Sequence, residues 1–258
     1  QKFIDRDYKV TLPSPYLLTR SMWLREITGK VYEGRKELGQ DVIDLLKNEI
    51  RHLVEEGVKI IQIDEPILSE VVFTNEKADN SFYWGALSEK VKVDKELKFA
   101  RELLDPVLEE IRKHDGVLSI MHVCRGNWTT DESVLLQGAY DKLGKFFDAL
   151  DLDMLALEFS TPRAGEVEKL FSNNFLDTRV MLGFGCINPR SEVIETPEEI
   201  VSRVEELLQF LPPERIWLNP DCGFATFAKR PLNPYPIIQK KLENMVAASK
   251  ILREKYCK

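Results

Sequence analysis

Short, almost continuously apolar runs alternate along this chain with long amphipathic stretches. Strands that are apolar on both faces are typical of parallel sheets covered by helices on each side. The six runs that predict strands are Tyr8–Leu12, Val58–Asp64, Val117–Val123, Met154–Glu158, Arg179–Gly183 and Arg215–Asn219. The stretches that predict helices are Arg35–Glu56, Asp94–Lys113, Ser133–Leu150, one that begins at the capping box of Thr196, and Tyr235–Lys255. The pattern therefore predicts an α/β fold.

Two α/β architectures have this strand–helix repeat, an open doubly wound sheet and a (β/α)8 barrel. A dinucleotide-binding sheet carries a glycine-rich loop after its first strand, whereas this chain has Leu12-Pro13-Ser14-Pro15 there. We therefore expect a (β/α)8 TIM barrel, with residues 1–258 forming a single domain. The polar and aromatic stretch Asn75–Lys92 predicts an irregular surface insertion.

Charge and cysteine content narrow the class of protein further. The 36 basic and 43 acidic residues give a net charge of −7, which argues against a nucleic-acid partner. The chain has no apolar run of the roughly 18–20 residues that a membrane helix needs. Four cysteines in 258 residues do not make a disulfide scaffold, so we expect a cytoplasmic protein with free or metal-bound thiols.

Side chains of the types that bind metals recur where the predicted strands end. In barrels, functional groups come from the carboxyl ends of the strands and the loops that follow. Reading each strand to its end gives Asp64 and Glu65, His122 and Cys124, Glu158, Cys186, and Asp221 and Cys222. We therefore expect these side chains to meet at one rim of the barrel.

The tightest pair is His122 and Cys124, whose side chains point to the same side of an extended segment. A His-x-Cys pair alone is more often a buried histidine beside an apolar cysteine, and Glu158 alone is equally an exposed loop carboxylate. The Asn219-Pro220-Asp221-Cys222-Gly223 turn, however, is an unusual place for a purely structural cysteine. Together the four side chains offer nitrogen, oxygen and two sulfurs, a set that suits Zn²⁺ and disfavours Mg²⁺ or Ca²⁺.

Zinc with two thiolates and one carboxylate carries a charge of about −1, which makes it a poor electrophile for polarising a carbonyl. Such a site is better suited to holding a substrate thiol as a reactive thiolate, because zinc deprotonates a bound thiol. The residues therefore predict alkyl transfer to a thiol.

Three segments of the chain resemble the catalytic, C-terminal domain of cobalamin-independent methionine synthase. They are Ile61-Gln62-Ile63-Asp64-Glu65-Pro66, Met121-His122-Val123-Cys124 and Trp217-Leu218-Asn219-Pro220-Asp221-Cys222-Gly223. The resemblance implies a (β/α)8 barrel in which a zinc-bound homocysteine thiolate is methylated to methionine. It also implies zinc ligation by His122, Cys124, Glu158 and Cys222, with Asp64 holding the homocysteine ammonium.

The chain also departs from that family's pattern. The full-length family has a second, N-terminal barrel and a histidine after the seventh strand that protonates the departing folate. The equivalent stretch here is Phe184-Gly185-Cys186-Ile187-Asn188-Pro189. These departures resemble the short, single-barrel core methionine synthases, which implies a methylated corrinoid as the donor because a cob(I)alamin leaving group needs no proton. Cys186 is then either an apolar filler or a thiol near the donor.

Five residues around the predicted zinc ligands have predicted roles. We assign Asp64 and Glu65 to the catalytic rim, with Glu65 orienting it by hydrogen bonding. Arg125 and Asn127 are predicted to contact a substrate carboxylate or a corrinoid side chain, although loop solvation would explain them equally. Asp221 is predicted to fix the His122 ring or the Cys222 turn.

Three other functions stay open at this point. The donor could be methyl-tetrahydrofolate, the acceptor could be another thiol such as coenzyme M, or the chain could be a non-catalytic barrel that zinc stabilises. The resemblance also bears on length, since eight strand–helix units close a barrel and six are visible. Aligned in order, Tyr8–Leu12 is the third strand, and we expect an N-terminally incomplete barrel that begins at Gln1.

Overall fold

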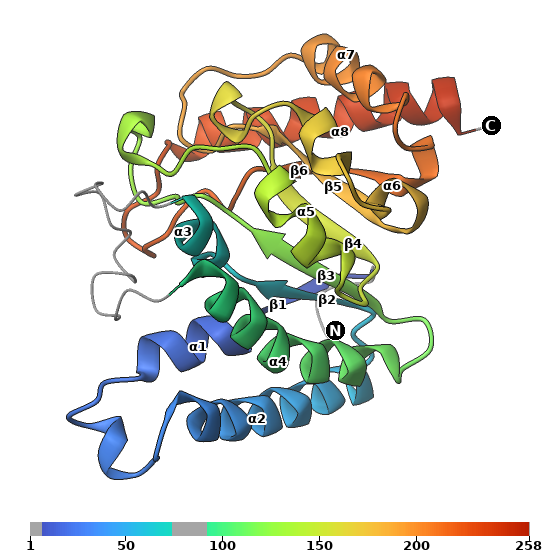
Figure 1. The fold of residues 1–258 in the computed structure, drawn as a ribbon. Coiled ribbons are helices and arrows are strands. Elements are labelled where there is room, and N and C mark those ends of the chain that lie inside the picture. Colours follow the sequence, from blue (N-terminus) through green and yellow to red (C-terminus); the bar gives the residue numbers. More distant parts are fainter. Residues whose placement is uncertain (1–6, 74–91, 258) are drawn as a thin grey trace. The chain divides into compact units, whose positions relative to one another are not determined.

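Strands and helices alternate in the computed structural model, which describes residues 7–73 and 92–257 (Figure 1). The strands are β1 (Lys9–Pro13), β2 (Ile60–Asp64), β3 (Leu118–Val123), β4 (Met154–Glu158), β5 (Met181–Ile187) and β6 (Ile216–Pro220). The α-helices are α1 (Pro15–Met22), α2 (Arg35–Glu55), α3 (Ile67–Phe73), α4 (Val93–Arg112), α5 (Asp141–Asp148), α6 (Leu176–Arg179), α7 (Pro197–Leu207) and α8 (Tyr235–Tyr256). Except for Lys92, the predicted insertion Asn75–Lys92 lies outside the described residues.

The chain divides into two units, Gln1–Val123 with Ala149–Met154 and Cys124–Asp148 with Leu155–Lys258. In the first unit, β1, β2 and β3 are parallel neighbours in that order. Their register pairs Pro13 with Asp64 and Asp64 with His122. Side chains at the carboxyl ends of these three strands therefore lie at the same level.

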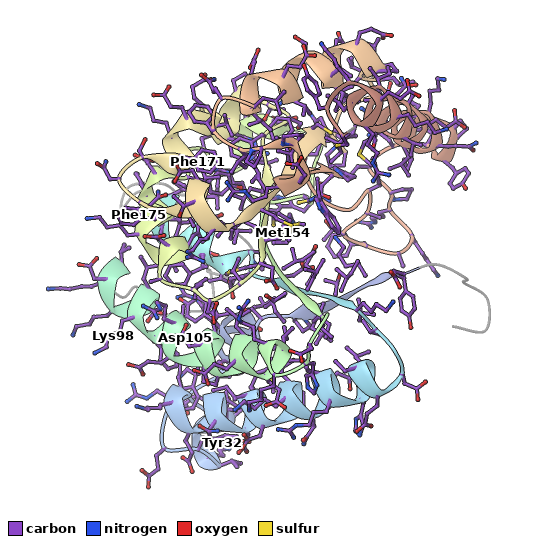
Figure 2. The ribbon with its side chains drawn as sticks, turned by 90° about the vertical axis from the view of Figure 1, so that its right-hand side faces the viewer. Tyr32, Lys98, Asp105, Met154, Phe171 and Phe175 are labelled. Carbon is purple, nitrogen blue, oxygen red and sulfur yellow. The ribbon has the colours of Figure 1, made fainter. Side chains whose placement is uncertain are left out.

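Three helices of the first unit, α1, α2 and α4, lie side by side (Figure 1). The buried side chains of α2, among them Leu38, Val42, Leu46 and Ile50, recur at intervals of four and so form one apolar face. Figure 2 shows Lys98 on the solvent-facing side of α4. The helical periodicity of the sequence predicts α2 and α4 to within one residue at each end.

In the second unit, β4, β5 and β6 follow in order, with β5 and β6 parallel. The prediction that the fifth strand ends at Gly183 is wrong, because β5 continues to Ile187 and contains Cys186. Glycine is depleted in strands, which hid the continuation. Gly185 is required there, because a Cβ atom would collide with the Asp221 carboxylate and the Leu157 carbonyl oxygen.

The predicted helix Ser133–Leu150 is also too long. A single 3-10 turn, η3 (Glu132–Val134), precedes α5, which covers only Asp141–Asp148. Gly138 between them has φ of +146°, outside the helical range. By contrast, α7 begins at the predicted capping box, in which Thr196 and Glu199 each bond the other's backbone N–H.

The α/β class and the parallel strands are confirmed, and the described residues contain six strands. Closure into an eight-stranded barrel stays a prediction. Within 7–73 and 92–257, each helix is too short or too polar to span a bilayer.

Candidate metal centre

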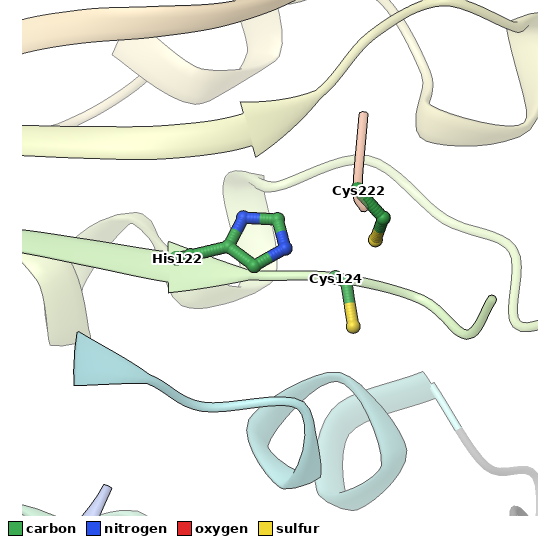
Figure 3. A group of neighbouring side chains, drawn as sticks. All are labelled: His122, Cys124 and Cys222. Carbon is green, nitrogen blue, oxygen red and sulfur yellow. The ribbon is translucent and has the colours of Figure 1, made fainter. Parts of the chain in front are cut away.

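One histidine nitrogen and two cysteine sulfurs lie within 4.8 Å of one another in this structure (Figure 3). His122 lies on β3, Cys124 follows the last residue of that strand, and Cys222 lies two residues beyond β6. Alternation along the extended β3 segment explains why His122 and Cys124 share one side. These three of the four predicted ligands therefore form a group that could hold a metal ion, and ligation by them stays a prediction.

The donor set fits Zn²⁺. Tetrahedral zinc with bonds of about 2.0–2.3 Å places its ligand atoms about 3.3–3.8 Å apart, a separation compatible with this group. One nitrogen and two soft sulfurs favour zinc over oxygen-seeking cations. Three protein ligands would leave a fourth position for a carboxylate or a substrate thiol.

Glu158, the last residue of β4, lies beside this group without being part of it. The Cys222 thiol donates to Glu158 Oε1 at 3.1 Å, and Arg163 Nη2 donates to Glu158 Oε2 at 3.0 Å. Burial opposes ionisation of Glu158, but the guanidinium groups of Arg190, Arg163 and Arg125 outweigh it and lower the pKa of the carboxyl. Glu158 is therefore a buried carboxylate adjacent to one predicted ligand.

The two thiols interact with each other. A hydrogen bond with Cys124 is the largest cause that raises the pKa of the Cys222 thiol well above its usual value, and burial adds to it. A zinc ion deprotonates the thiols that coordinate it. Metal binding by this pair is therefore expected to release protons.

Arg163 and Arg190 were not among the predicted site residues. Arg163 lies in the 3-10 turn η4 (Pro162–Ala164) after β4, and Arg190 follows β5. Both side chains are almost fully buried, and Arg190 Nη2 donates to Asp221 Oδ2 at 2.9 Å. Their signal in the sequence was their position shortly after strand ends, which Arg125 shares.

Asp221 connects the end of β6 to the segment after β4. Its carboxylate accepts hydrogen bonds from the Phe159 and Ser160 backbone N–H groups at 3.1 and 2.9 Å, and from the Ser160 hydroxyl. Burial, with repulsion from Glu158, raises the pKa of Asp221 to about 6 despite the Arg190 partner. Because Asp221 precedes Cys222, these bonds fix the start of the Cys222 turn.

Asp64 is the last residue of β2 in the first unit, and Glu65 follows it. Asp64 Oδ1 accepts from Gln62 Nε2 at 2.6 Å and the residue is partly exposed. Glu65 is buried, accepts from Ser14 Oγ and from the Ile67 backbone N–H, and its own N–H donates to the His122 carbonyl at 2.8 Å. Burial raises the pKa of Glu65 to about 7. Glu65 therefore connects α1, α3 and β3.

Three other predicted site residues contact the chain itself. Arg125 is buried over the Tyr140 ring at 3.7 Å and donates to the Gly138 carbonyl at 2.6 Å. Asn127 donates to the Gly223 carbonyl. Cys186 is buried in β5 and burial raises the pKa of its thiol to about 12. Ligand contacts by Arg125 and Asn127, and a donor-side role for Cys186, stay predictions.

An α/β fold with six strands and a group of one histidine and two cysteines that could hold a metal ion define an α/β protein with a candidate metal site. The chain belongs to the family described as cobalamin-independent synthase, catalytic domain, whose model matches residues 31–98 and 121–251. The family resemblance stated from the motifs is thereby confirmed.

The curated relatives that the chain matches are described as methionine synthases. The chain is 30% identical to a methionine synthase of Sulfurisphaera tokodaii over 246 residues, which is 95% of this chain and 57% of that protein. It is 27% identical to a methionine synthase of Saccharolobus solfataricus, over 95% of this chain and 58% of that protein. The chain thus spans less than two thirds of the length of these relatives.

Solved structures show the same fold. A B12-independent methionine synthase from a Shewanella species, in complex with selenomethionine, superposes with a TM-score of 0.70 at 20% identity and covers 98% of this chain and 64% of that one. A methyltransferase from Methanosarcina mazei superposes with a TM-score of 0.57 at 17% identity, over 98% of this chain and 60% of that one.

Proposed function

We propose that this protein transfers a methyl group to the zinc-bound thiolate of homocysteine and so forms methionine. Zinc would be held by His122, Cys124 and Cys222, with the Glu158 carboxylate as the fourth ligand. The observation that carries the proposal is the His122–Cys124–Cys222 group beside Glu158 in a chain of this family.

Bound zinc would supply the acidity that keeps a substrate thiol ionised at neutral pH. The residues around it supply an electron-rich environment, because two thiolates and one carboxylate donate to the ion. The thiolate sulfur then forms a bond to the methyl carbon, and the donor departs with the electron pair of the bond that breaks. Such a site favours attack by sulfur over polarisation of a carbonyl.

Recognition of the amino-acid acceptor is assigned to Asp64, whose carboxylate would pair with the homocysteine ammonium. The register of β2 and β3 supports this, because it pairs Asp64 with His122. Glu65 would hold this rim in place through the bonds that it makes to Ser14, Ile67 and the His122 carbonyl. Arg125 and Asn127 are the proposed contacts to a substrate carboxylate or a corrinoid side chain.

A methylated corrinoid is the proposed donor, because its cob(I)alamin leaving group departs without a proton. A folate leaving group needs an acid, and the resemblance places a histidine after the strand that corresponds to β5. This chain has three histidines, of which His52 lies in α2, His114 follows α4 and His122 lies on β3. With a pKa of about 12, the Cys186 thiol is a poor acid at neutral pH.

The test is a methyl-transfer assay on the zinc-loaded chain with homocysteine, comparing methylcobalamin with methyl-tetrahydrofolate. We expect methionine to form with methylcobalamin and not with methyl-tetrahydrofolate. Cys222→Ala should lose both zinc and activity, whereas Cys257→Ala, which removes an exposed thiol, should retain both. Turnover with free methyl-tetrahydrofolate would overturn the donor assignment.

Two other outcomes address the remaining alternatives. Equal methylation of coenzyme M would overturn homocysteine as the acceptor. Tight zinc binding without methyl transfer from either donor would favour a non-catalytic, zinc-stabilised domain.

A further inference from the structure

We propose that Arg163, Arg190 and Glu132 form, with Glu158, a closed ring of alternating charges that sets how strongly Glu158 binds the metal. The inference rests on the proposed function, because it treats Glu158 as a zinc ligand. It assigns positioning roles to three residues that have none so far.

The ring is continuous in the second unit. Arg163 contacts Glu158 Oε2 at 3.0 Å through Nη2 and Glu132 Oε2 at 3.6 Å through Nε. Arg190 contacts Glu158 Oε1 at 3.6 Å through Nη1 and Glu132 Oε1 at 3.7 Å through Nε. Each arginine therefore bridges the same two carboxylates, and each carboxylate divides its oxygens between the same two arginines.

Burial distinguishes the members of the ring. The exposed fractions of the side chains are 1% for Glu158, 5% for Arg163 and 0% for Arg190, but 28% for Glu132. Ion pairs that are shielded from water are screened far less than surface pairs. Glu132 is thus the one member that solvent reaches, and its charge acts on Glu158 through two buried cations.

The bonds to Glu132 are long. Its two contacts with the arginines exceed hydrogen-bond length, and the Nε atoms of Arg163 and Arg190 have no hydrogen-bond partner among the described residues. Asn188 Nδ2 holds Glu132 Oε1 at 2.6 Å and keeps the carboxylate in place. Arg163 is consequently bound more closely to Glu158 than to Glu132. Arg190 lies at nearly equal distances of 3.6 and 3.7 Å from the two carboxylates and is held in place by Asp221 at 2.9 Å.

A carboxylate that two guanidinium groups already bind is a weaker metal ligand than a free one. This matches the position of Glu158, which touches Cys222 yet lies outside the group formed by His122, Cys124 and Cys222. Because Glu132 pairs with the same two arginines, it weakens their interaction with Glu158 and so favours metal binding by Glu158. An exchangeable fourth ligand suits a site in which a substrate thiol must take that position.

Substitution of an arginine of the ring and substitution of Glu132 should change the zinc affinity in opposite directions. Arg163→Gln removes one cation from Glu158 and should tighten zinc binding about 10-fold. Glu132→Gln removes the competing carboxylate, so both arginines interact more strongly with Glu158, and zinc binding should weaken about 10-fold. Both changes lie within the range known for residues that support metal ligands. Zinc dissociation constants of the apoprotein are measured by competition with a chromophoric chelator. Glu168→Gln, an exposed charge change without a place in the ring, is the control and should leave the affinity unchanged.

The decisive step repeats both substitutions in a Glu158→Gln background, where the two effects should vanish because they act through that carboxylate. Effects that persist there, or that are absent in the wild-type background, overturn the ring while the proposed function stands. A wild-type chain that binds no zinc overturns both. Because Glu132 is partly exposed to solvent, Glu132→Gln tests the proposal by itself if Arg163→Gln does not fold. In the Co²⁺ form, the thiolate-to-cobalt charge-transfer absorption should show two thiolate ligands in every variant.

Discussion

Asp64 is the residue to which the proposed function assigns recognition of the acceptor. It is partly exposed at the end of β2, and a charged hydrogen bond to an ammonium contributes about 1.5–3 kcal/mol. We predict that Asp64→Ala raises the KM for homocysteine about 10- to 100-fold, with a smaller change in kcat. Steady-state kinetics measures this, with exposed Asp115→Ala as the control. An unchanged KM would remove Asp64 from the acceptor site.

A second prediction at the residue scale concerns the thiol of Cys222. Because the pKa of Cys222 is raised, its thiol is protonated at neutral pH and must ionise when it binds zinc. We therefore expect zinc binding to release protons in weakly buffered solution, and zinc affinity to fall as the pH is lowered. Proton release is followed with a pH indicator. Cys222→Ser should release fewer protons, and equal release from both proteins would contradict ligation by this thiol.

Residue types and their positions beyond strand ends were enough to predict His122, Cys124 and Cys222 as one group. They were not enough to predict the arginines around Glu158. A metal ligand is recognised by its own chemistry, whereas Arg163 and Arg190 matter only through carboxylates that come from other segments, at 132, 158 and 221. Such pairings depend on the three-dimensional arrangement and have no local sequence pattern.

At the scale of elements, the approach of β4, β5 and β6 depends on Gly185. A Cβ atom there would overlap the Asp221 carboxylate and backbone atoms of Leu157 and Glu158, which cannot move without disturbing the strands. Overpacking of this kind costs about 1–3 kcal/mol. We predict that Gly185→Ala lowers the free energy of unfolding by that amount in urea titrations, and that it weakens zinc binding.

The matched control is Gly34→Ala, because a Cβ atom at Gly34 meets nothing within 4 Å and the backbone there is extended. It should cost less than Gly185→Ala, about 0.5–1 kcal/mol, because alanine is a poorer N-cap of α2 than glycine, and it should leave zinc binding unchanged. Equal losses in the two variants would show that packing at Gly185 is not the cause.

Periodicity located five of the six strands closely, because buried parallel strands are continuous apolar runs. It failed at β5, where Gly183 and Gly185 are present for close packing rather than for strand propensity. It also failed before α5, where apolar residues at 135 and 136 continue a helical pattern that Gly138 interrupts. Both errors arise where backbone geometry overrides the hydrophobic pattern.

At the scale of the whole molecule, acid should destabilise the fold through Glu110. The hydrogen bond from Arg51 is the main cause that lowers the pKa of Glu110 to about 2 from its usual 4.5, burial opposes it, and Lys113 adds to the lowering. A carboxylate with a lowered pKa stabilises the fold above the pKa of the unfolded chain. That contribution is lost as the pH falls from about 4.5 towards 2.

We therefore predict that Glu110→Gln is less stable than the wild type at pH 7 and that the difference shrinks between pH 4.5 and pH 2. Urea unfolding across this range is the measurement, with the neighbouring exposed residue substituted in Glu109→Gln as the control. A difference that does not depend on pH would assign the loss to packing instead of charge.

The fold class of the whole molecule could be predicted from the alternation of strands and helices, and the family from three motifs. The number of strands that complete a barrel could not, because strand count is a property of closure and not of any segment. The described residues contain six strands, and the chain spans 57% of the Sulfurisphaera relative.

The central claim is that His122, Cys124 and Cys222 hold a zinc ion that binds the acceptor thiol. X-ray absorption at the zinc edge, on the zinc-loaded chain with and without homocysteine, tests it most directly. The account predicts two sulfur ligands without homocysteine and three with it. A sulfur count that stays at two when homocysteine is added would contradict the account.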